Sequence, residues 1–287
     1  MNAAPGTTDA RSGVALITVM LVFIVMSSII VAMLSRQRLD VQRTRNMLNQ
    51  AQAFQYALGA EELARQVLAA DAAAGSEADH SGQDWASLRE GVPLAQGSLV
   101  FFLDDLQGRF NLNTLISRTD EPMTRFRQLE KVLGIEHDLL PAILARVGSP
   151  QTPRPLASVQ SLRDLEGMTP EIYATLSPYV VALPQEEPRL NVNTAPLPVL
   201  KAYIPQESDL KNFLKKREKK GFLTRDDLAS LGITTTGMTV QSQFFRLNAQ
   251  AEVQNSRVSL TSIIYREIDA TGAVSQRIIS RDMSKNF

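Results

Sequence analysis

An uncharged stretch near the N-terminus constrains the fold of this chain more than any other feature. It runs for 21 residues from Val14 to Leu34, and only Thr18, Ser27 and Ser28 within it are polar. As a helix that rises about 1.5 Å per residue, it would be roughly 31 Å long, which matches the hydrocarbon core of a bilayer. We therefore predict a transmembrane helix over residues 14–34.

The rest of the 287-residue chain has the composition of a soluble protein. Without the apolar stretch about 41% of its residues are apolar, an ordinary globular fraction. The 30 basic and 30 acidic side chains cancel, which argues against binding to nucleic acid through overall charge. Cysteine is absent and the histidines are His80 and His137, so disulfides and thiol chemistry are excluded and little is left for histidine-based catalysis. We expect no enzymatic activity and no catalytic residues.

The residues before the apolar stretch indicate how it is processed. An ordinary secretory signal has an apolar region of about 7–15 residues and then a cleavage site of small residues. This stretch is longer, and a short polar leader, residues 1–13, instead ends in Gly13 directly before Val14. Cleavage after Gly13 would keep the apolar helix in the mature protein. An uncleaved signal anchor and a buried core helix are the plainer alternatives.

The charges on the two sides of the apolar stretch bear on its orientation. Four arginines and one aspartate follow it within residues 35–45, whereas one arginine and one aspartate precede it. The positive-inside tendency would place the C-terminal part in the cytoplasm. Long domains translocate largely regardless of such charges, so we expect the C-terminal part outside the cytoplasm in spite of this conflict.

The helix is predicted to continue beyond the membrane segment. Residues 14–73 contain no proline and one glycine, Gly59, and apolar residues recur at spacings of three and four. A single helix over this range would be roughly 90 Å long. We therefore predict a stem whose second half, residues 35–75, packs on a soluble domain.

Strand-like runs lie on both sides of a long helical region. Apolar and alternating runs predict strands over residues 98–103, 244–253, 258–268 and 274–281. We therefore predict an α+β fold, in which the long N-terminal helix packs on a small antiparallel sheet formed by residues 76–113 and 238–287.

The region between these strands, residues 114–237, is predicted to be a large inserted subdomain that is all α. Its pattern is helical, and residues typical of helix starts stand at Thr169, Thr194, Ser208 and Thr224. Gly221 follows the basic segment KNFLKKREKK and is predicted to end its helix.

Several segments together resemble the minor pseudopilin K family of type II secretion systems. They are GVALITV at residues 13–19, SRQRLDVQRTRN at 35–46, AFQYALGAEELARQVL at 53–68, DHSGQDWA at 79–86, DLQGRFNLN at 105–113, RPLASVQSLRDLEGMTPEIYATLSPYVVALP at 154–184 and LNVNTAPLPVL at 190–200. They span nearly the whole chain in the family's order. The resemblance implies a pilin-like fold, prepilin-type cleavage between Gly13 and Val14, N-methylation of Val14, and a helix in the Gram-negative inner membrane with the C-terminal domain in the periplasm.

The resemblance also implies a role in assembly. The protein would join minor pseudopilins I and J in a complex that caps the pseudopilus, the fibre that helps to export folded proteins across the outer membrane. Further implied partners are major pseudopilin G, the prepilin peptidase, the inner-membrane assembly platform, inner-membrane lipid, the exported substrates and the secretin. Thr18 stands where most pilins carry a glutamate. Members of the K family also lack this glutamate. Its absence fits a subunit at the tip of the fibre, which has no earlier subunit above it to dock on.

Calcium has been associated with some members of the family. This chain departs from their acidic loop, because residues 142–157 contain no acidic side chain. Calcium takes about six to eight oxygen ligands, for which Asp104, Asp105, Asp120 and Glu121 are the candidates. We expect no cofactor.

Residues 191–227 admit an alternative interpretation of the function. The order of segments over residues 191–227, with the basic run at 211–220, resembles helix-hairpin-helix DNA-binding repeats, so a DNA-binding or DNA-uptake membrane protein is the alternative function. The linker between the two predicted helices lacks the glycine pair that such repeats use to bind phosphate and contains two acids, so we expect no nucleic acid. His80 and Trp85 are interpreted as structural residues.

Overall fold

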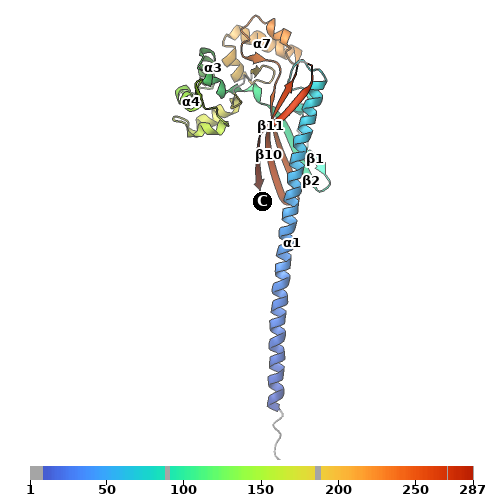
Figure 1. The fold of residues 1–287 in the computed structure, drawn as a ribbon. Coiled ribbons are helices and arrows are strands. Elements are labelled where there is room, and N and C mark those ends of the chain that lie inside the picture. The colour runs from blue at the N-terminus through green and yellow to red at the C-terminus, as the bar shows by residue number, and fades with distance from the viewer. Residues whose placement is uncertain (1–8, 88–90, 185–188, 270, 287) are drawn as a thin grey trace, which may run out of the picture.

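The computed structural model describes residues 9–87, 91–184, 189–269 and 271–286, with the side chains of residues 14–283 within these ranges. A single helix, α1 (Asp9–Ala73), forms a long stem, and the rest of the chain lies around its C-terminal end (Figure 1). The helix ends at Ala73 as predicted. It begins at Asp9 rather than Val14, so residues 9–13 of the predicted leader belong to the same helix.

The second half of α1 packs on the sheet through small side chains. Ala53, Ala57, Ala60 and Ala64 are fully buried and Leu68 follows them on the same side. Spacings of three and four place these residues on one helix face. Because alanine ends at Cβ, the helix axis can approach the sheet closely, and Figure 1 shows α1 lying along the strands.

The sheet has five strands in the order β1-β2-β9-β10-β11, and every neighbouring pair is antiparallel. The strands are β1 (Gly91–Leu94), β2 (Gly97–Asp105), β9 (Phe244–Val253), β10 (Ser256–Ile268) and β11 (Val274–Asn286). Four of them were predicted. The sequence pattern missed β1, which is short and contains Pro93, a residue that sheets tolerate at an edge.

The face of the sheet toward α1 forms one hydrophobic core. Alternate residues of β2, β9 and β10 are buried there, among them Leu99 and Phe101 of β2 and Leu247 of β9. Trp85 closes the core from α2 (Asp84–Ser87) and packs edge-on against Phe245, with ring centroids 5.2 Å apart.

The helical head, which we define as the described part of residues 106–243, joins β2 to β9. Its α-helices are α3 (Asp120–Val132), α4 (Leu140–Val147), α5 (Pro170–Leu176), α6 (Leu197–Tyr203), α7 (Glu207–Lys220) and α8 (Arg225–Ala229). Its 3-10 helices are η1 (Leu106–Gly108), η2 (Leu112–Ser117), η3 (Val159–Asp164) and η4 (Ser177–Tyr179). A second hydrophobic core, with Phe110, Phe126 and Phe213 at 0% exposure, fills it.

Short strand pairs also occur in the head, and four of their strands, β4 to β7, lie in residues 114–237, where the sequence predicted only helix. They are β3 (Phe110–Asn111) with β6 (Val180–Val181), β4 (Gly148–Ser149) with β5 (Thr152–Pro153), and β7 (Leu190–Asn191) with β8 (Met238–Thr239). Each strand has two residues, too few for a periodic pattern to reveal. The β3–β6 and β7–β8 pairs tie together segments that are distant in the sequence, whereas β4 and β5 form a local hairpin.

Two of the predicted helix starts are confirmed. The Thr169 hydroxyl accepts a hydrogen bond from the N–H of Ile172 at the start of α5. Thr224 and Asp227 form a capping box, in which each side chain accepts from the other residue's backbone N–H.

The other two predicted starts are each wrong by two residues. Pro196 precedes α6, and the Thr194 hydroxyl donates instead to Oδ2 of Asp105 at 2.5 Å. Gln206 precedes α7, and Ser208 lies inside its first turn. Gly221 ends α7 as predicted, with a φ of 83°.

Glu130 of α3 is a buried carboxyl that links two helices of the head. The residue is 5% exposed, and its Oε1 accepts a 2.8 Å hydrogen bond from the N–H of Leu139 just before α4. Burial raises the pKa of Glu130 from its ordinary 4.5 to about 7. Between pH 4.5 and about 7, Glu130 is therefore protonated in the folded chain but ionised in the unfolded chain.

We expect the free energy of unfolding to fall as the pH rises from about 4.5 through 7, because more protons bind to the folded than to the unfolded chain there. Glu130→Gln keeps an acceptor for Leu139 and removes the titration, so it should stabilise the chain above pH 7 by up to roughly 3 kcal/mol. Urea unfolding at pH values below 4.5 and above 7 measures the free energy of unfolding of the parent and the variant. The exposed Glu136→Gln is the control, and identical pH profiles for Glu130→Gln and the parent would contradict the prediction.

Candidate functional site

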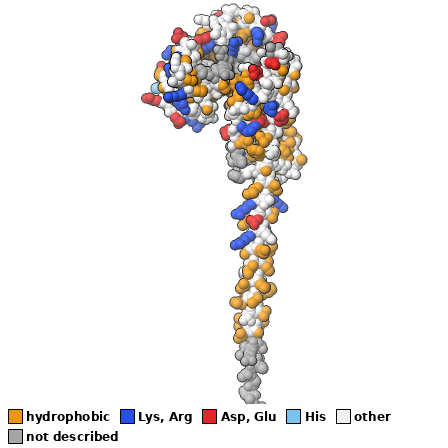
Figure 2. Space-filling model, in the orientation of Figure 1, with side chains coloured by type: hydrophobic (Ala, Val, Ile, Leu, Met, Phe, Trp, Pro, Cys, Tyr) orange, Lys and Arg blue, Asp and Glu red, His pale blue; other side chains and the backbone are white. Residues whose placement is uncertain are grey.

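The first half of α1 exposes a continuous apolar surface. Its large apolar side chains from Val14 to Leu34 are 50–72% exposed. This helix is the one in the described residues that is long and apolar enough to cross a membrane, with a mean hydropathy of 2.9 in its most apolar part, where nothing is buried. Figure 2 shows apolar side chains around this part of the stem. Lipid or other apolar helices must cover such a surface.

The predicted processing site lies within this helix. Gly13 and Val14 are both part of α1, and Val14 is 63% exposed. The Thr18 hydroxyl donates to the carbonyl oxygens of Val14 and Ala15 at 3.1 and 2.9 Å. Thr18 is therefore satisfied within its own helix and offers a neighbour no charge. Cleavage after Gly13 and methylation of Val14 stay predictions.

The structure gives two of the candidate calcium ligands, which lie at the end of β2, other partners. Asp104 forms an ion pair with Arg246 at 2.8 Å and lies 4.0 Å from Arg109. Asp105 is buried, which raises the pKa of its carboxyl, and it accepts hydrogen bonds from the N–H of Gln107 and the side chains of Asn191, Thr194 and Ser242. Its oxygens therefore bind protein donors.

The other two candidates lie in the first turn of α3. Glu121 pairs with Arg125 at 2.5 Å, and Asp120 precedes it. No group of three or more acidic or histidine side chains with metal-site geometry occurs in the described residues. The four carboxylates that the sequence suggested are thus not brought together as one ligand set.

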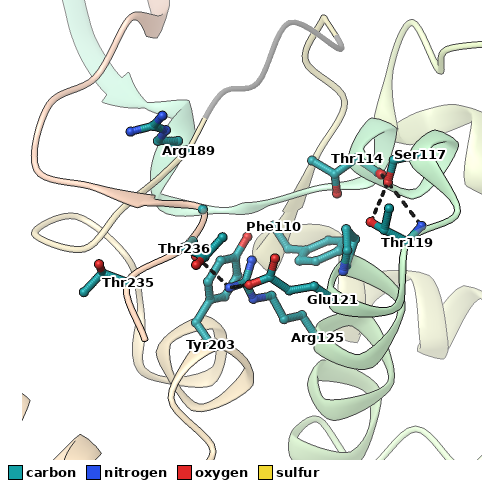
Figure 3. Close-up of a pocket in the computed structure, with 12 residues that line it drawn as sticks. Phe110, Thr114, Ser117, Thr119, Glu121, Arg125, Arg189, Tyr203, Thr235 and Thr236 are labelled. Atoms are coloured by element: carbon teal, nitrogen blue, oxygen red, sulfur yellow. Dashed lines mark hydrogen bonds and ion pairs between the residues drawn. The ribbon is translucent and has the colours of Figure 1, made fainter. Parts of the chain in front are cut away.

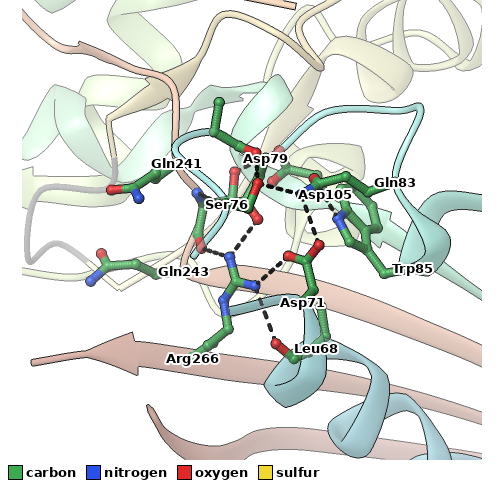
Figure 4. Close-up of polar contacts among 12 residues, drawn as sticks. Leu68, Asp71, Ser76, Asp79, Gln83, Trp85, Asp105, Gln241, Gln243 and Arg266 are labelled. Carbon is green, nitrogen blue, oxygen red and sulfur yellow. Dashed lines mark hydrogen bonds and ion pairs between the residues drawn. The ribbon is translucent and has the colours of Figure 1, made fainter. Parts of the chain in front are cut away.

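Arg266 of β10 is the centre of a buried polar network between stem, sheet and head (Figure 4). Its side chain is 2% exposed. One terminal nitrogen donates to Oδ1 of Asp79 at 2.5 Å and to the carbonyl oxygen of Ser242 at 3.0 Å, and the other lies 3.3 Å from Oδ2 of Asp71 in α1. The guanidinium also lies over the ring of Phe245. One arginine therefore connects the stem and the segment that follows it to the C-terminal end of the head.

Asn191 of β7 extends this network into the head. Its side-chain amide donates to the carbonyl oxygen of Asp79 at 3.0 Å, to Oδ2 of Asp105 at 2.9 Å and to Oγ of Ser242 at 2.8 Å. Asp79 in turn accepts from the N–H of Ser242 at 2.6 Å and donates its own N–H to Val240. We call Asp71, Asp79, Asp105, Asn191, Ser242 and Arg266 the junction network. It fixes the head on the stem and the sheet.

Sequence reasoning missed this network, although one signal for it exists. In β10 the residues Val258, Leu260, Ser262 and Ile264 are buried at every second position, and Arg266 continues the series. Strand alternation therefore places a lone arginine on the buried face, where a charge needs a partner. The partner itself cannot be read from a local pattern, because Asp71 and Asp79 are distant in the sequence.

The head uses the same Asn-x-Asn-Thr segment twice, at residues 111–114 and 191–194. In each copy the side-chain amide of the second asparagine exchanges two hydrogen bonds with the backbone of a leucine: Asn113 with Leu156 at 2.8 and 3.0 Å, and Asn193 with Leu223 at 2.8 and 2.9 Å. The first pair joins the segment before α3 to the segment after α4, and the second joins the segment before α6 to the segment after α7. The segment that resembled a DNA-binding repeat thus uses asparagine side chains to hold its own backbone.

The basic helix α7 is partly neutralised within the head. Lys216 and Lys220 lie 3.1 and 2.5 Å from Oδ1 of Asp227, and hydrogen bonds from Lys220 and then the neighbouring groups hold the pKa of this carboxyl far below its usual range. Lys211, Lys215 and Lys219 are exposed. Part of the basic run therefore fixes α8 to α7, which does not favour the DNA-binding alternative.

A hollow of about 660 Å³ lies in the head beside α3 (Figure 3). Arg125 crosses it, donating to Oε1 of Glu121 at 2.5 Å and to the carbonyl oxygen of Thr236 at 2.7 Å. Its guanidinium lies 4.2 Å from the ring centroid of Tyr203, whose pKa burial raises to about 12. Arg125 thus joins α3 to α6 and to the segment before β8.

His80 and Trp85 make structural contacts, as interpreted from the sequence. The His80 ring stacks on Phe222 with centroids 4.2 Å apart, and its Nδ1 accepts from the N–H of Gly82. Burial lowers the pKa of His80. Trp85 is buried and donates its Nε1–H to Oε1 of Gln83 at 2.9 Å.

Comparisons with known proteins agree on one family. The family described as type II secretion system (T2SS), protein K, matches residues 190–243, and a further one of the same description matches residues 144–185. Type II secretion system protein K of Pseudomonas aeruginosa is 31% identical over 96% of this chain and 93% of its own length. Those of Aeromonas hydrophila and Klebsiella pneumoniae are each 29% identical, over 90% and 93% of this chain and 94% and 96% of their own lengths.

The fold is also similar to that of a solved structure. A chain in the crystal structure of the GspK-GspI-GspJ complex from the type 2 secretion system of enterotoxigenic Escherichia coli matches with a TM-score of 0.66. The match covers 85% of this chain and 100% of that chain, at 22% sequence identity.

Proposed function

Because this chain belongs to the type II secretion system protein K family, we propose that it caps the tip of the periplasmic pseudopilus as a minor pseudopilin. In this proposal α1 anchors it in the Gram-negative inner membrane with the globular part in the periplasm, and it assembles with minor pseudopilins I and J. The complex that the structural relative forms with GspI and GspJ supports these two partners. Its role is structural, and it uses no catalytic residue.

The position of the head on the stem carries the proposal. In Figure 1 the head lies at the end of the molecule opposite the membrane segment and extends to one side of the stem axis. Subunits in the shaft of a pilin-like fibre pack their stems side by side with an axial offset. A head of this size would occupy the space of the next subunit in a shaft, but it meets no such neighbour at the end.

The exposed apolar half of α1 supports the remaining contacts. Major pseudopilin G and the I- and J-type subunits would cover it once it leaves the bilayer, and the prepilin peptidase and the assembly platform would meet it within the inner membrane. Contacts with exported substrates and with the secretin would then involve the head, which faces away from the membrane.

The tip position predicts where the protein is found on isolated fibres. Sheared pseudopili labelled with gold-conjugated antibody against the head should carry label at one end only, because the head is excluded from the shaft. Antibody against major pseudopilin G on the same fibres is the control and should label their length. Head label spread along the fibre would contradict the proposal.

A further inference from the structure

Four arginines lie on α1 directly after its apolar half, and their function is not explained by the assembly role. They are Arg36, Arg38, Arg43 and Arg45, and the one acidic residue between Val14 and Leu48 is Asp40. All four are exposed. Arg43 lies 3.8 Å from Asp40, while the other three form no ion pair or side-chain hydrogen bond with any described residue.

Their height along the stem matches the headgroup layer of a bilayer. If Leu34 marks the end of the hydrocarbon core, Arg36 and Arg38 lie about 3 and 6 Å beyond it along the helix axis. A headgroup layer is roughly 5–8 Å thick on each side. Arg43 and Arg45 lie about 14 and 17 Å beyond Leu34, within roughly one or two Debye lengths of that layer.

Their distribution around the helix argues for lipid rather than one protein neighbour. Arg36 and Arg43 share one face and Arg38 and Arg45 share another, with the two faces about 160° apart at 100° per residue. Figure 2 shows basic side chains on both sides of the stem at this level. A single docked subunit would meet one face, whereas lipid headgroups surround the helix.

A shallow groove on the stem adds a place for a lipid. It is lined by the apolar side chains of Leu34 and Val41 and by the polar or charged side chains of Gln37, Arg38, Gln42 and Arg45. Apolar side chains next to two cations fit a phospholipid, whose acyl chain and phosphodiester need these two environments.

We propose that Arg36, Arg38, Arg43 and Arg45 form a collar that binds the phosphate groups of anionic phospholipids in the leaflet next to the globular part. The inference uses the membrane anchorage of the proposed function but not the tip position, and it holds for either orientation of the helix. The collar retains the subunit in anionic regions of the membrane until assembly extracts it.

The chain lacks cysteine, so a single introduced thiol can carry a probe. Full-length protein with Asn46→Cys, labelled with a fluorescent donor, is reconstituted into phosphatidylcholine vesicles containing about one-fifth phosphatidylglycerol. A trace of acceptor on the acyl chain of either lipid reports local enrichment by energy transfer. We expect acceptor phosphatidylglycerol to be enriched about threefold over acceptor phosphatidylcholine, and about 0.5 M sodium chloride to reduce this.

The matched variants remove three positive charges at different places. Arg36→Gln, Arg38→Gln and Arg45→Gln together should abolish the enrichment while leaving the Arg43–Asp40 pair. Lys211→Gln, Lys215→Gln and Lys219→Gln together remove as much charge from the head and should leave it unchanged. Lysine at the three collar positions should restore it, because the attraction is one of charge. The collar segment is exposed helix, so circular dichroism of each variant should match the parent.

Two outcomes would overturn the inference. One is equal transfer to both acceptors in the parent protein; if the collar variant then also loses cross-linking to I- and J-type pseudopilins, the arginines belong to a protein interface. The other is competition by inorganic phosphate beyond that of sodium chloride at equal ionic strength, which would make free phosphate the ligand.

Discussion

Arg266→Met is expected to lower the free energy of unfolding by about 3–5 kcal/mol, the cost of removing one partner from a buried ion pair. The carboxylate of Asp79 is 4% exposed and that of Asp71 is 12% exposed. Methionine fills a similar volume but removes the cation that neutralises both carboxylates and the donor of the Ser242 carbonyl oxygen, and leaves the carboxylates only the neutral donors Ser242 N–H and Gln83. Water cannot replace the guanidinium easily, because Phe245 and the α1 backbone enclose it.

Urea denaturation of the full chain in detergent, followed by tryptophan fluorescence, measures this effect. Trp85 is the single tryptophan and packs against Phe245, next to Arg266, so its emission reports this core directly. The matched control is Arg257→Met in the same strand. Arg257 forms an exposed pair with Glu252, with side chains 49% and 45% exposed, and its loss should change the free energy of unfolding by less than about 1 kcal/mol.

A second variant separates charge from packing. Arg266→Lys keeps a cation that can reach Asp79 but loses the planar fork that also binds Ser242 and Asp71, so it should recover part of the stability. Equal costs for Arg266→Met and Arg257→Met would show that the junction network does not hold the head on the sheet.

The parts of the fold that were predicted correctly are those that local pattern determines. The stem follows from an apolar run and the absence of proline, and four strands follow from alternation. The Thr224–Asp227 capping box was also visible, because its two hydrogen bonds join residues three apart. Each of these features is decided within a few helical turns or strand residues.

The parts that sequence reasoning missed depend on contacts between distant segments. Thr194 has the right chemistry to start a helix, but Asp105 is close enough in the fold to take its hydroxyl, so α6 begins later. The partners of the candidate carboxylate Asp105 depend on the fold in the same way, because it accepts hydrogen bonds from four protein donors, namely Gln107, Asn191, Thr194 and Ser242. A carboxylate's partners are set by topology, which a one-dimensional pattern does not contain.

Gly13→Leu is expected to abolish maturation and, with it, secretion that depends on this subunit. N-terminal sequencing of the membrane fraction should begin at Val14 for the parent and at Met1 for the variant, because the predicted cleavage follows a residue without a side chain. Ala15→Leu, one residue beyond the scissile bond, is the matched control and should still be cleaved. An intact Met1 in the parent, with an active prepilin peptidase present, would contradict the processing hypothesis.

The expected loss of secretion in Gly13→Leu has a physical cause in the leader that remains on the uncleaved chain. Assembly must bring the first residues of α1 among the apolar stems of neighbouring subunits, where Thr18 offers no charge and its hydroxyl is already bonded to Val14 and Ala15. An uncleaved chain would bring Asp9 and Arg11 of the leader to the same place. Each charge in an apolar surrounding costs about 2.5–3.5 kcal/mol unless it is paired. Secretion should therefore fall even if the variant reaches the membrane in normal amounts, which immunoblotting of the membrane fraction would establish.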